Sequence, residues 1–318
     1  MMRGALFATL AVVLGGCGLG KAERAAADSA SAMARITRLT SQIDDPRGRT
    51  DVPLAKWMMP RDLQEISGMV LTPDGNHVLA HGDENGHLVE LEWRSGMVTR
   101  RFDLGEQTVK GDFEGITRVG LDYYMLSSKG EIYQFREAED GKRADYLVID
   151  TKLGKECEFE GIAHDPLTNA LLMACKTPEK SMRDSLVIYR WPLGDNPPPV
   201  SRITIPLDLV IGSNDWNDLR PSDITVDPFT GNFVLITAQE RAMIVISRDG
   251  VVVSAGPVPT EIPHAEGIAI TREGLLLISA EKGDAPASIT IFRWPHPGRQ
   301  AAAPVGGVPT DTINPSQP

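Results

Sequence analysis

A short repeated motif, Glu-Gly-Ile, limits the folds open to this chain more than any other feature. It occurs three times, and two degenerate copies, Ser-Gly-Met and Ser-Asp-Ile, complete the series. The central residues of the five copies are separated by 47, 46, 62 and 44 residues; they are Gly68, Gly115, Gly161, Asp223 and Gly267. A period of this length is typical of repeat architectures, in which one supersecondary unit recurs along the chain.

Within each period, short apolar or alternating runs are separated by turn residues, which predicts four strands per unit. In the first unit we expect strands at 65–72, 77–83, 87–93 and 98–104. Four-stranded units of about 45 residues are typical of a β-propeller. The sequence therefore predicts an all-β fold with five four-stranded blades, or six blades if residues 35–60 build more than one strand.

The fifth unit has only three expected strands, so another part of the chain must complete it. A propeller usually closes its ring with a strand from the opposite terminus. Residues 35–40 mix apolar and polar side chains in a strand-like pattern. We therefore expect the closing strand at 36–39, with the stretch around 52–57 as the substitute donor.

The N-terminal residues 1–16 have the features of a signal peptide. A short positive start precedes an apolar run at 5–14, which is too short for a membrane span. The following sequence LGGC is similar to the lipobox of bacterial lipoproteins, which implies cleavage before Cys17 and lipidation of its thiol. The alternative is an ordinary signal peptide with an incidental cysteine.

Export and lipid anchoring determine the expected organisation of the rest of the chain. Residues 17–34 are expected to form the lipid anchor and a tether, 35–298 the propeller, and 299–318 a disordered tail. Gly18 rather than aspartate follows the cysteine, so in a Gram-negative cell we expect the periplasmic face of the outer membrane. The membrane partner is then reached through the lipid on Cys17, because several acyl chains anchor a protein stably.

The charge of the chain excludes one class of partner. The net charge is −11, and no basic stripe is present, so the sequence argues against a nucleic-acid partner. We expect a monomer whose ligand is a small molecule or an envelope protein. The two remaining cysteines, Cys157 and Cys175, flank one expected hairpin, so either a disulfide or two separate thiols is possible.

The repeated glutamates are the candidate functional residues. Glu114, Glu160 and Glu266 each begin the innermost strand of a blade, so they are expected to crowd one mouth of the central channel. Converging carboxylates raise one another's pKa unless a positive charge lies among them. A Ca²⁺ ion is one solution, because it accepts several oxygen ligands in irregular geometry, and Asp223 could add another oxygen.

Lysines at the ends of the second strands are the rival solution. Lys129, Lys176 and Lys282 each follow a glutamate of the same blade, which predicts three ion pairs within blades and no metal. Glutamates that are simply hydrated are a third possibility. The hairpin register, which the sequence does not determine, decides whether each pair shares a face.

Several runs resemble the SdiA-regulated family of bacterial exported proteins. These runs are DFEGITRV, EFEGIAHDPLTNALLMACK, RPSDITVDPFTGNFVLIT and HAEGIAITREGLLLISAEK. They are also distantly similar to NHL-repeat propellers and to the esterase-like domain associated with phytases. The family resemblance implies a five-bladed propeller with a calcium site, and the distant one implies metal-supported lactone or phosphoester hydrolysis.

These observations favour a lipid-anchored envelope propeller that binds a calcium-type cation at its channel mouth and acts as a ligand- or partner-binding protein. One alternative is a metal-dependent hydrolase of lactones, esters or phosphoesters. His264, two residues before Glu266, is then a weak candidate for the general base. A structural interaction scaffold is the other alternative.

Overall fold

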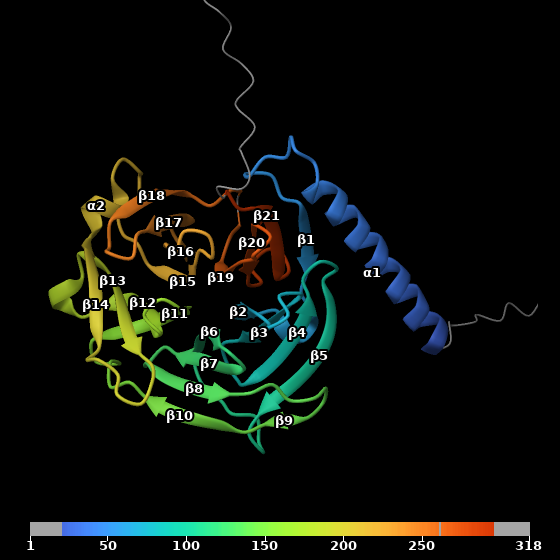
Figure 1. Cartoon of the computed structure of the whole chain (residues 1–318), viewed down its shortest axis with the longest axis horizontal. Coiled ribbons are helices and arrows are strands. Elements are labelled where there is room, and N and C mark those ends of the chain that lie inside the picture. Colours follow the sequence, from blue (N-terminus) through green and yellow to red (C-terminus); the bar gives the residue numbers. More distant parts are fainter. Residues whose placement is uncertain (1–20, 261, 296–318) are drawn as a thin grey trace, which may run out of the picture.

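The structure is a computed structural model that describes residues 21–260 and 262–295. The strands in this part of the chain form five sheets, and Figure 1 shows them arranged as blades around a common centre. The fold is therefore the predicted all-β propeller with five blades rather than six. The expected signal peptide at 1–16, Cys17 and the expected tail at 299–318 lie outside the described residues.

The blades follow one another along the chain. Blade 1 contains β2 (Ile66–Leu71), β3 (His77–Gly82), β4 (His87–Glu92) and β5 (Met97–Leu104), with β9 (Arg143–Ala144) parallel to β5. Blade 2 contains β6 (Phe113–Val119), β7 (Asp122–Ser127), β8 (Glu131–Phe135) and β10 (Tyr146–Asp150). Blade 3 contains β11 (Cys157–Asp165), β12 (Ala170–Pro178), β13 (Ser185–Pro192) and β14 (Ser201–Pro206). Blade 4 contains β15 (Pro221–Val226), β16 (Phe233–Thr237), β17 (Ala242–Ile246) and β18 (Val252–Pro257). Blade 5 contains β19 (Ala265–Ile270), β20 (Leu275–Ala280), β21 (Ser288–Arg293) and β1 (Ala55–Met58).

The ring closes through a strand from the N-terminal side, but the substitute donor supplies it. Strand β1 runs antiparallel to β21, and the register pairs Ala55 with Ile291 and Met58 with Ser288. The prediction of a closing strand at 36–39 is wrong, because these residues lie in a helix.

Helix α1 (Lys21–Ile43) covers most of the segment expected as a tether and replaces the expected first strand. The apolar residues Ala32, Leu39 and Ile43 are seven and four residues apart, so they share one face of a helix. Leu39 is buried and Ile43 packs beside it in the cluster between blades 5 and 1. Helical periodicity therefore explains the segment better than the strand pattern.

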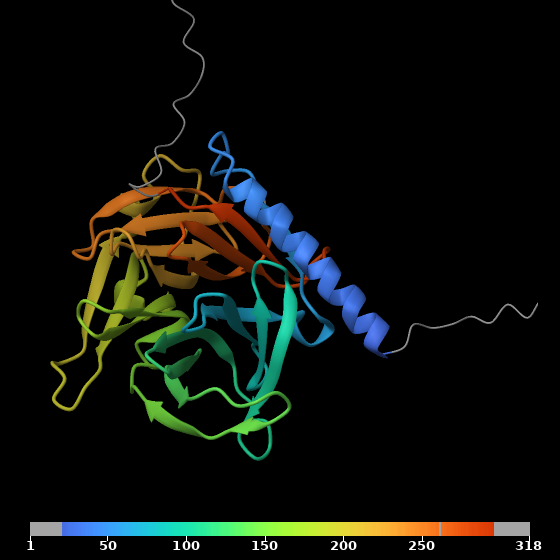
Figure 2. The same cartoon turned by 45° about the vertical axis from the view of Figure 1, so that its right-hand side comes forward.

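Polar contacts hold α1 against the propeller. Arg35 donates from Nη1 to the backbone oxygen of Ser95 over 2.7 Å, and Arg293 donates to the backbone oxygen of Gln42. Figure 2 shows α1 running along the outer edge of the ring, past blades 5 and 1. No helix in residues 21–260 and 262–295 has the length and apolar character needed to cross a bilayer.

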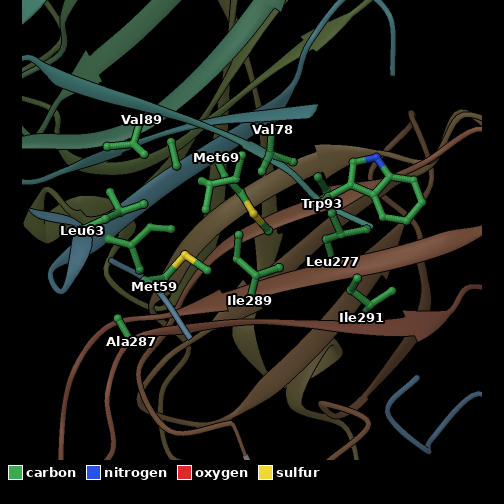
Figure 3. Close-up of a cluster of buried hydrophobic side chains, with 14 of the residues drawn as sticks. Met59, Leu63, Met69, Val78, Val89, Trp93, Leu277, Ala287, Ile289 and Ile291 are labelled. Carbon is green, nitrogen blue, oxygen red and sulfur yellow. The ribbon is translucent and has the colours of Figure 1, made fainter. Parts of the chain in front are cut away.

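The core lies between the blades. A buried apolar cluster fills each of the five junctions between neighbours. Figure 3 shows the cluster between blades 5 and 1, where Met69 and Trp93 face Leu277 and Ile289. Middle strands are covered on both faces, and all six residues of β20 are buried, which explains why all of them except Ser279 are apolar.

The inner strands approach most closely at the column of Gly68, Gly115, Gly161, Asp223 and Gly267. A Cβ atom added to Gly115 would lie 3.0 Å from the backbone nitrogen of Ile162. One added to Gly161 would lie 2.6 Å from the Cα atom of Asp223. Neighbouring strands therefore meet backbone to backbone, an approach that glycine permits because it has no side chain.

Candidate cation site at one channel mouth

A β-bulge occupies the same position in every blade. The register between the first and second strands shifts directly before the glycine column in all five hairpins. The residue without a cross-strand partner is Ser67, Glu114, Glu160, Ser222 or Glu266. A bulged residue leaves the ladder and its side chain is re-aimed. The Glu-Gly-Ile repeat is therefore the sequence of a bulge that begins each innermost strand.

The bulged glutamates interact with one another at one mouth of the channel, here called the acidic mouth and defined by Glu114, Glu160, Glu266 and Glu281. Burial and the negative charges of Glu160 and Asp112 raise the pKa of Glu114 to about 9. Burial and the charges of Glu160 and Glu281 raise the pKa of Glu266 to about 8. At neutral pH, Glu114 and Glu266 therefore hold their protons.

Lys176 lies among these carboxyl groups. Its Nζ forms an ion pair with Oε1 of Glu160, and its charge also acts on Glu114 and Glu266 to lower their pKa values. Burial raises the pKa of Glu160, and the lysine opposes this rise. Of the three lysines predicted to pair with the glutamates, Lys176 is therefore the one that lies in the acidic mouth.

The other two lysines of the predicted ion pairs lie elsewhere. Lys129 and Lys282 are exposed, and neither has an ion pair with a residue that the structure describes. In each hairpin, one residue of the second strand pairs with the glycine-column residue. Lys176 lies two residues after that partner in blade 3, and the equivalent positions are Ser128 in blade 2 and Glu281 in blade 5. An offset of one residue along a strand reverses the direction of the side chain, so the lysines do not face the glutamates.

Asp223 stands in the glycine column rather than at the bulge, and its carboxyl group bonds to three inner strands. Its Oδ2 accepts a hydrogen bond from the backbone N–H of Ile268 and its Oδ1 accepts one from Ile224, both over 2.8 Å. The N–H of Ile162 is a third donor. Burial raises the pKa of Asp223 well above its ordinary value, while the three donors oppose the rise. Its oxygens are thus engaged by the inner strands of blades 3, 4 and 5.

The hairpin formed by the first and second strands is longest in blade 3, and a disulfide joins its two strands. Strands β11 and β12 each have nine residues, and Cys157 and Cys175 are bonded with their Cα atoms 5.7 Å apart. Lys176 follows Cys175 directly within β12, whereas Lys129 and Lys282 lie beyond the ends of their strands. The cross-link therefore holds the segment that carries the lysine of the acidic mouth.

Removing this disulfide should destabilise the protein without changing its fold. The bond closes a loop with a sequence separation of 18 residues, and loops of this size contribute about 3 kcal/mol to the free energy of unfolding. Urea denaturation should show this loss in the double variant Cys157→Ser/Cys175→Ser. The wild type in reductant should match the variant, and an equal midpoint for all three samples would contradict the expectation.

The carboxyl groups of the acidic mouth are of the type that binds a cation, but their present positions do not form a coordination site. Carboxylate oxygens are the ligands that Ca²⁺ prefers. Among residues 21–260 and 262–295, however, no group of three or more His, Cys, Asp or Glu side chains is arranged to hold a metal ion. Lys176 bonds to Glu160 instead. Coordination by the three glutamates therefore requires side-chain movement at the mouth.

His264 and Glu281 lie together at the edge of the acidic mouth. Nδ1 of His264 is 3.5 Å from Oε1 of Glu281, and the histidine backbone has a φ of 54°. The sequence does not predict Glu281 as a site residue, because Lys282 is the residue that it places at the end of the second strand of this blade. Its position directly before that lysine was the signal that could have identified it.

The fold and the mouth define the class of protein: a five-bladed β-propeller with carboxyl groups gathered at one end of its channel. A family model described as SdiA-regulated matches residues 59–282. This chain therefore belongs to the SdiA-regulated family, as the sequence resemblance predicted.

Comparison with solved structures returns distant likenesses. A luciferin-regenerating enzyme is 11% identical over 77% of this chain and 98% of its own, with a TM-score of 0.48. The glutaminyl cyclase of Myxococcus xanthus is 13% identical over 76% of this chain and 94% of its own, with a TM-score of 0.49. No curated protein matches the sequence.

Proposed function

We propose that this protein is a lipid-anchored envelope propeller that binds a divalent cation of the calcium type at its acidic mouth. The observation that carries the proposal is the excess of buried and half-buried carboxyl groups over positive charge there. Glu114, Glu160 and Glu266 share the ammonium of Lys176, and two of the three have pKa values near 8 and 9.

In this proposal the cation competes with protons and with Lys176. Binding would release the protons of Glu114 and Glu266 and separate Lys176 from Glu160. Cation affinity therefore increases with pH between about 6 and 9, because fewer protons have to be displaced. The same competition means that removal of the lysine charge strengthens binding.

Two features support an exported, anchored location. The disulfide between Cys157 and Cys175 suits an oxidising compartment. Helix α1 begins at Lys21, four residues after Cys17, and ends against the outer edge of the propeller. Radiolabelled palmitate incorporation into the full chain tests the anchor: labelling should require Cys17, and an equally labelled Cys17→Ala variant would reject it.

Calorimetric titration of the folded chain with CaCl₂ tests the cation site. We expect one Ca²⁺ per chain, an affinity at least about tenfold lower in Glu160→Gln, and an affinity about tenfold higher in Lys176→Met. Lys129→Met is the matched control, because this exposed lysine has no described ion pair, and it should bind as the wild type does. Absence of binding at millimolar Ca²⁺ at pH 8 would overturn the proposal.

The hydrolase alternative rests on one contact. His264 lies 3.5 Å from Glu281 and its side chain is 52% exposed, so this imidazole could exchange a proton with a carboxylate at the mouth. A panel of lactone, aryl ester and phosphodiester substrates, with and without EDTA, tests it. EDTA-sensitive turnover that is lost in His264→Gln would establish the enzyme, and no turnover would leave a binding protein.

A further inference from the structure

The opposite mouth of the channel contains a second, chemically different cavity, here called the arginine mouth. It has a volume of about 510 Å³, which is within the usual range for small-molecule sites. Residues at the ends of the innermost strands of all five blades line it. These strands begin at the acidic mouth, so the two sites lie at opposite ends of the same strands.

The floor of this cavity is apolar. The residue that follows the glycine column in each blade lines it, and all five of these residues are buried: Met69, Ile116, Ile162, Ile224 and Ile268. At the rim, the exposed side chain of Leu167 lines the cavity, and the turns that carry the lining residues Gly120 and Pro228 also carry the exposed apolar residues Leu121 and Phe229. An apolar body entering the cavity would therefore meet apolar residues at its floor and Leu167 at its rim.

Arginines give this mouth a positive charge. Arg118 donates from Nε to the backbone oxygen of Leu71 over 3.1 Å and from Nη1 to that of Gly120. Two carbonyl groups thus position its guanidinium, and within the described residues no carboxylate is bonded to it. Arg272 is exposed and also has no ion pair with a described residue.

The other charged groups of the cavity are satisfied by neighbours. Arg248 pairs with Asp165 and donates to the backbone oxygen of Gly231. Asp227 accepts hydrogen bonds within its own turn, from the N–H of Phe229 and the hydroxyl of Thr230.

His164, which also lines the cavity, has its pKa lowered by burial and by the charge of Arg118. Three arginines, Arg118, Arg248 and Arg272, therefore face the two carboxylates of Asp165 and Asp227, which leaves one positive charge in excess; Arg118 and Arg272 are the two that have no ion pair with a described residue. This local excess occurs in a chain whose net charge is −11, so it is not a consequence of overall composition.

We propose that the arginine mouth binds a small amphiphilic anion: a molecule with one carboxylate or phosphate group on an apolar body. The acidic group would bond to the guanidinium of Arg118, which carbonyls hold in place, and to the exposed guanidinium of Arg272. Guanidinium groups recognise both kinds of anion through paired N–H donors. The apolar body would cover the isoleucine floor. This inference does not depend on cation binding at the acidic mouth.

Calorimetry with decanoate, in the presence of EDTA, tests the site on the full chain. Decyltrimethylammonium is the probe of opposite charge, acetate lacks the apolar body, and decyl phosphate replaces the carboxylate. We expect decanoate and decyl phosphate to bind, and the other two not to bind. Arg118→Gln and Arg272→Gln should each lower decanoate affinity at least about fivefold.

Arg183→Gln is the control, because this exposed arginine lies outside the cavity, and its affinity should equal that of the wild type. Glu160→Gln should also leave decanoate binding unchanged. The proposal is overturned if decanoate does not bind at millimolar concentration, or if both arginine variants bind it as tightly as the control does. Arg272→Gln keeps the test decisive if Arg118→Gln fails to fold.

Discussion

In the absence of divalent cations, this protein should lose stability as the pH rises from 6 to 9, and Glu114→Gln/Glu266→Gln should remove most of that loss. Both carboxyl groups have folded-state pKa values above the ordinary value of 4.5, at about 9 and about 8. The folded state therefore binds more protons than the unfolded state throughout this range. Their stabilising contribution is complete below about pH 4.5 and disappears as the pH passes through 8 and 9.

The size of the effect follows from protons that the folded state holds and the unfolded state has already released, because both folded-state pKa values lie several units above 4.5. At pH 8 we expect the double variant to be more stable than the wild type by at least about 3 kcal/mol, since each unit of pKa difference corresponds to about 1.4 kcal/mol. Urea denaturation in EDTA at pH 6, 7, 8 and 9 measures this. Glu139→Gln is the matched control, because Glu139 is exposed and outside the acidic mouth, and it should keep the wild-type pH dependence. If the free energy of unfolding depends on pH in the same way for the double variant and the control, Glu114 and Glu266 do not hold these protons.

A second large effect is expected from a single side chain in the glycine column. Gly161→Val should lower the free energy of unfolding by about 4 kcal/mol or more, because the new atoms have no room. Even a Cβ atom at this position would lie 2.6 Å from the Cα of Asp223 and 2.8 Å from the nitrogen of Ile224. Blades 3 and 4 would have to separate, which would break the hydrogen bonds that converge on Asp223.

The control for this experiment is Gly256→Val in β18. A Cβ atom at Gly256 would meet nothing within 4 Å, and the backbone there is not in the left-handed region. This variant should therefore unfold at nearly the wild-type midpoint in thermal and urea denaturation. Equal losses for the two variants would mean that valine disturbs any strand, and that the column has no special role.

The sequence predicts the number of blades well because the repeat marks one local event, the bulge and close approach, in every blade. It predicts the placement of α1 poorly. The residues around Ile36 and Leu39 are compatible with either periodicity over six positions, and only the contacts of Leu39 with blades 5 and 1 decide between them. The closing strand could be predicted only as a pair of alternatives, since both candidates are short and apolar.

The candidate site was predictable in composition but not in pairing. Glu114, Glu160 and Glu266 could be placed at one mouth from the repeat alone. The bulges shift the cross-strand register, and Ser128 and Glu281, rather than lysines, occupy the positions equivalent to Lys176 in blades 2 and 5. The arginine mouth gave no repeated signal at all, because Arg118 and Arg272 occupy different positions in their blades.

Helix α1 has a mechanical consequence if Cys17 carries lipid. A helix of 23 residues is about 34 Å long, and its C-terminal part is fixed to the ring by Leu39 and Arg35. Such a stalk would then set how far the propeller can lie from the bilayer surface, and both channel mouths would stay within reach of that surface.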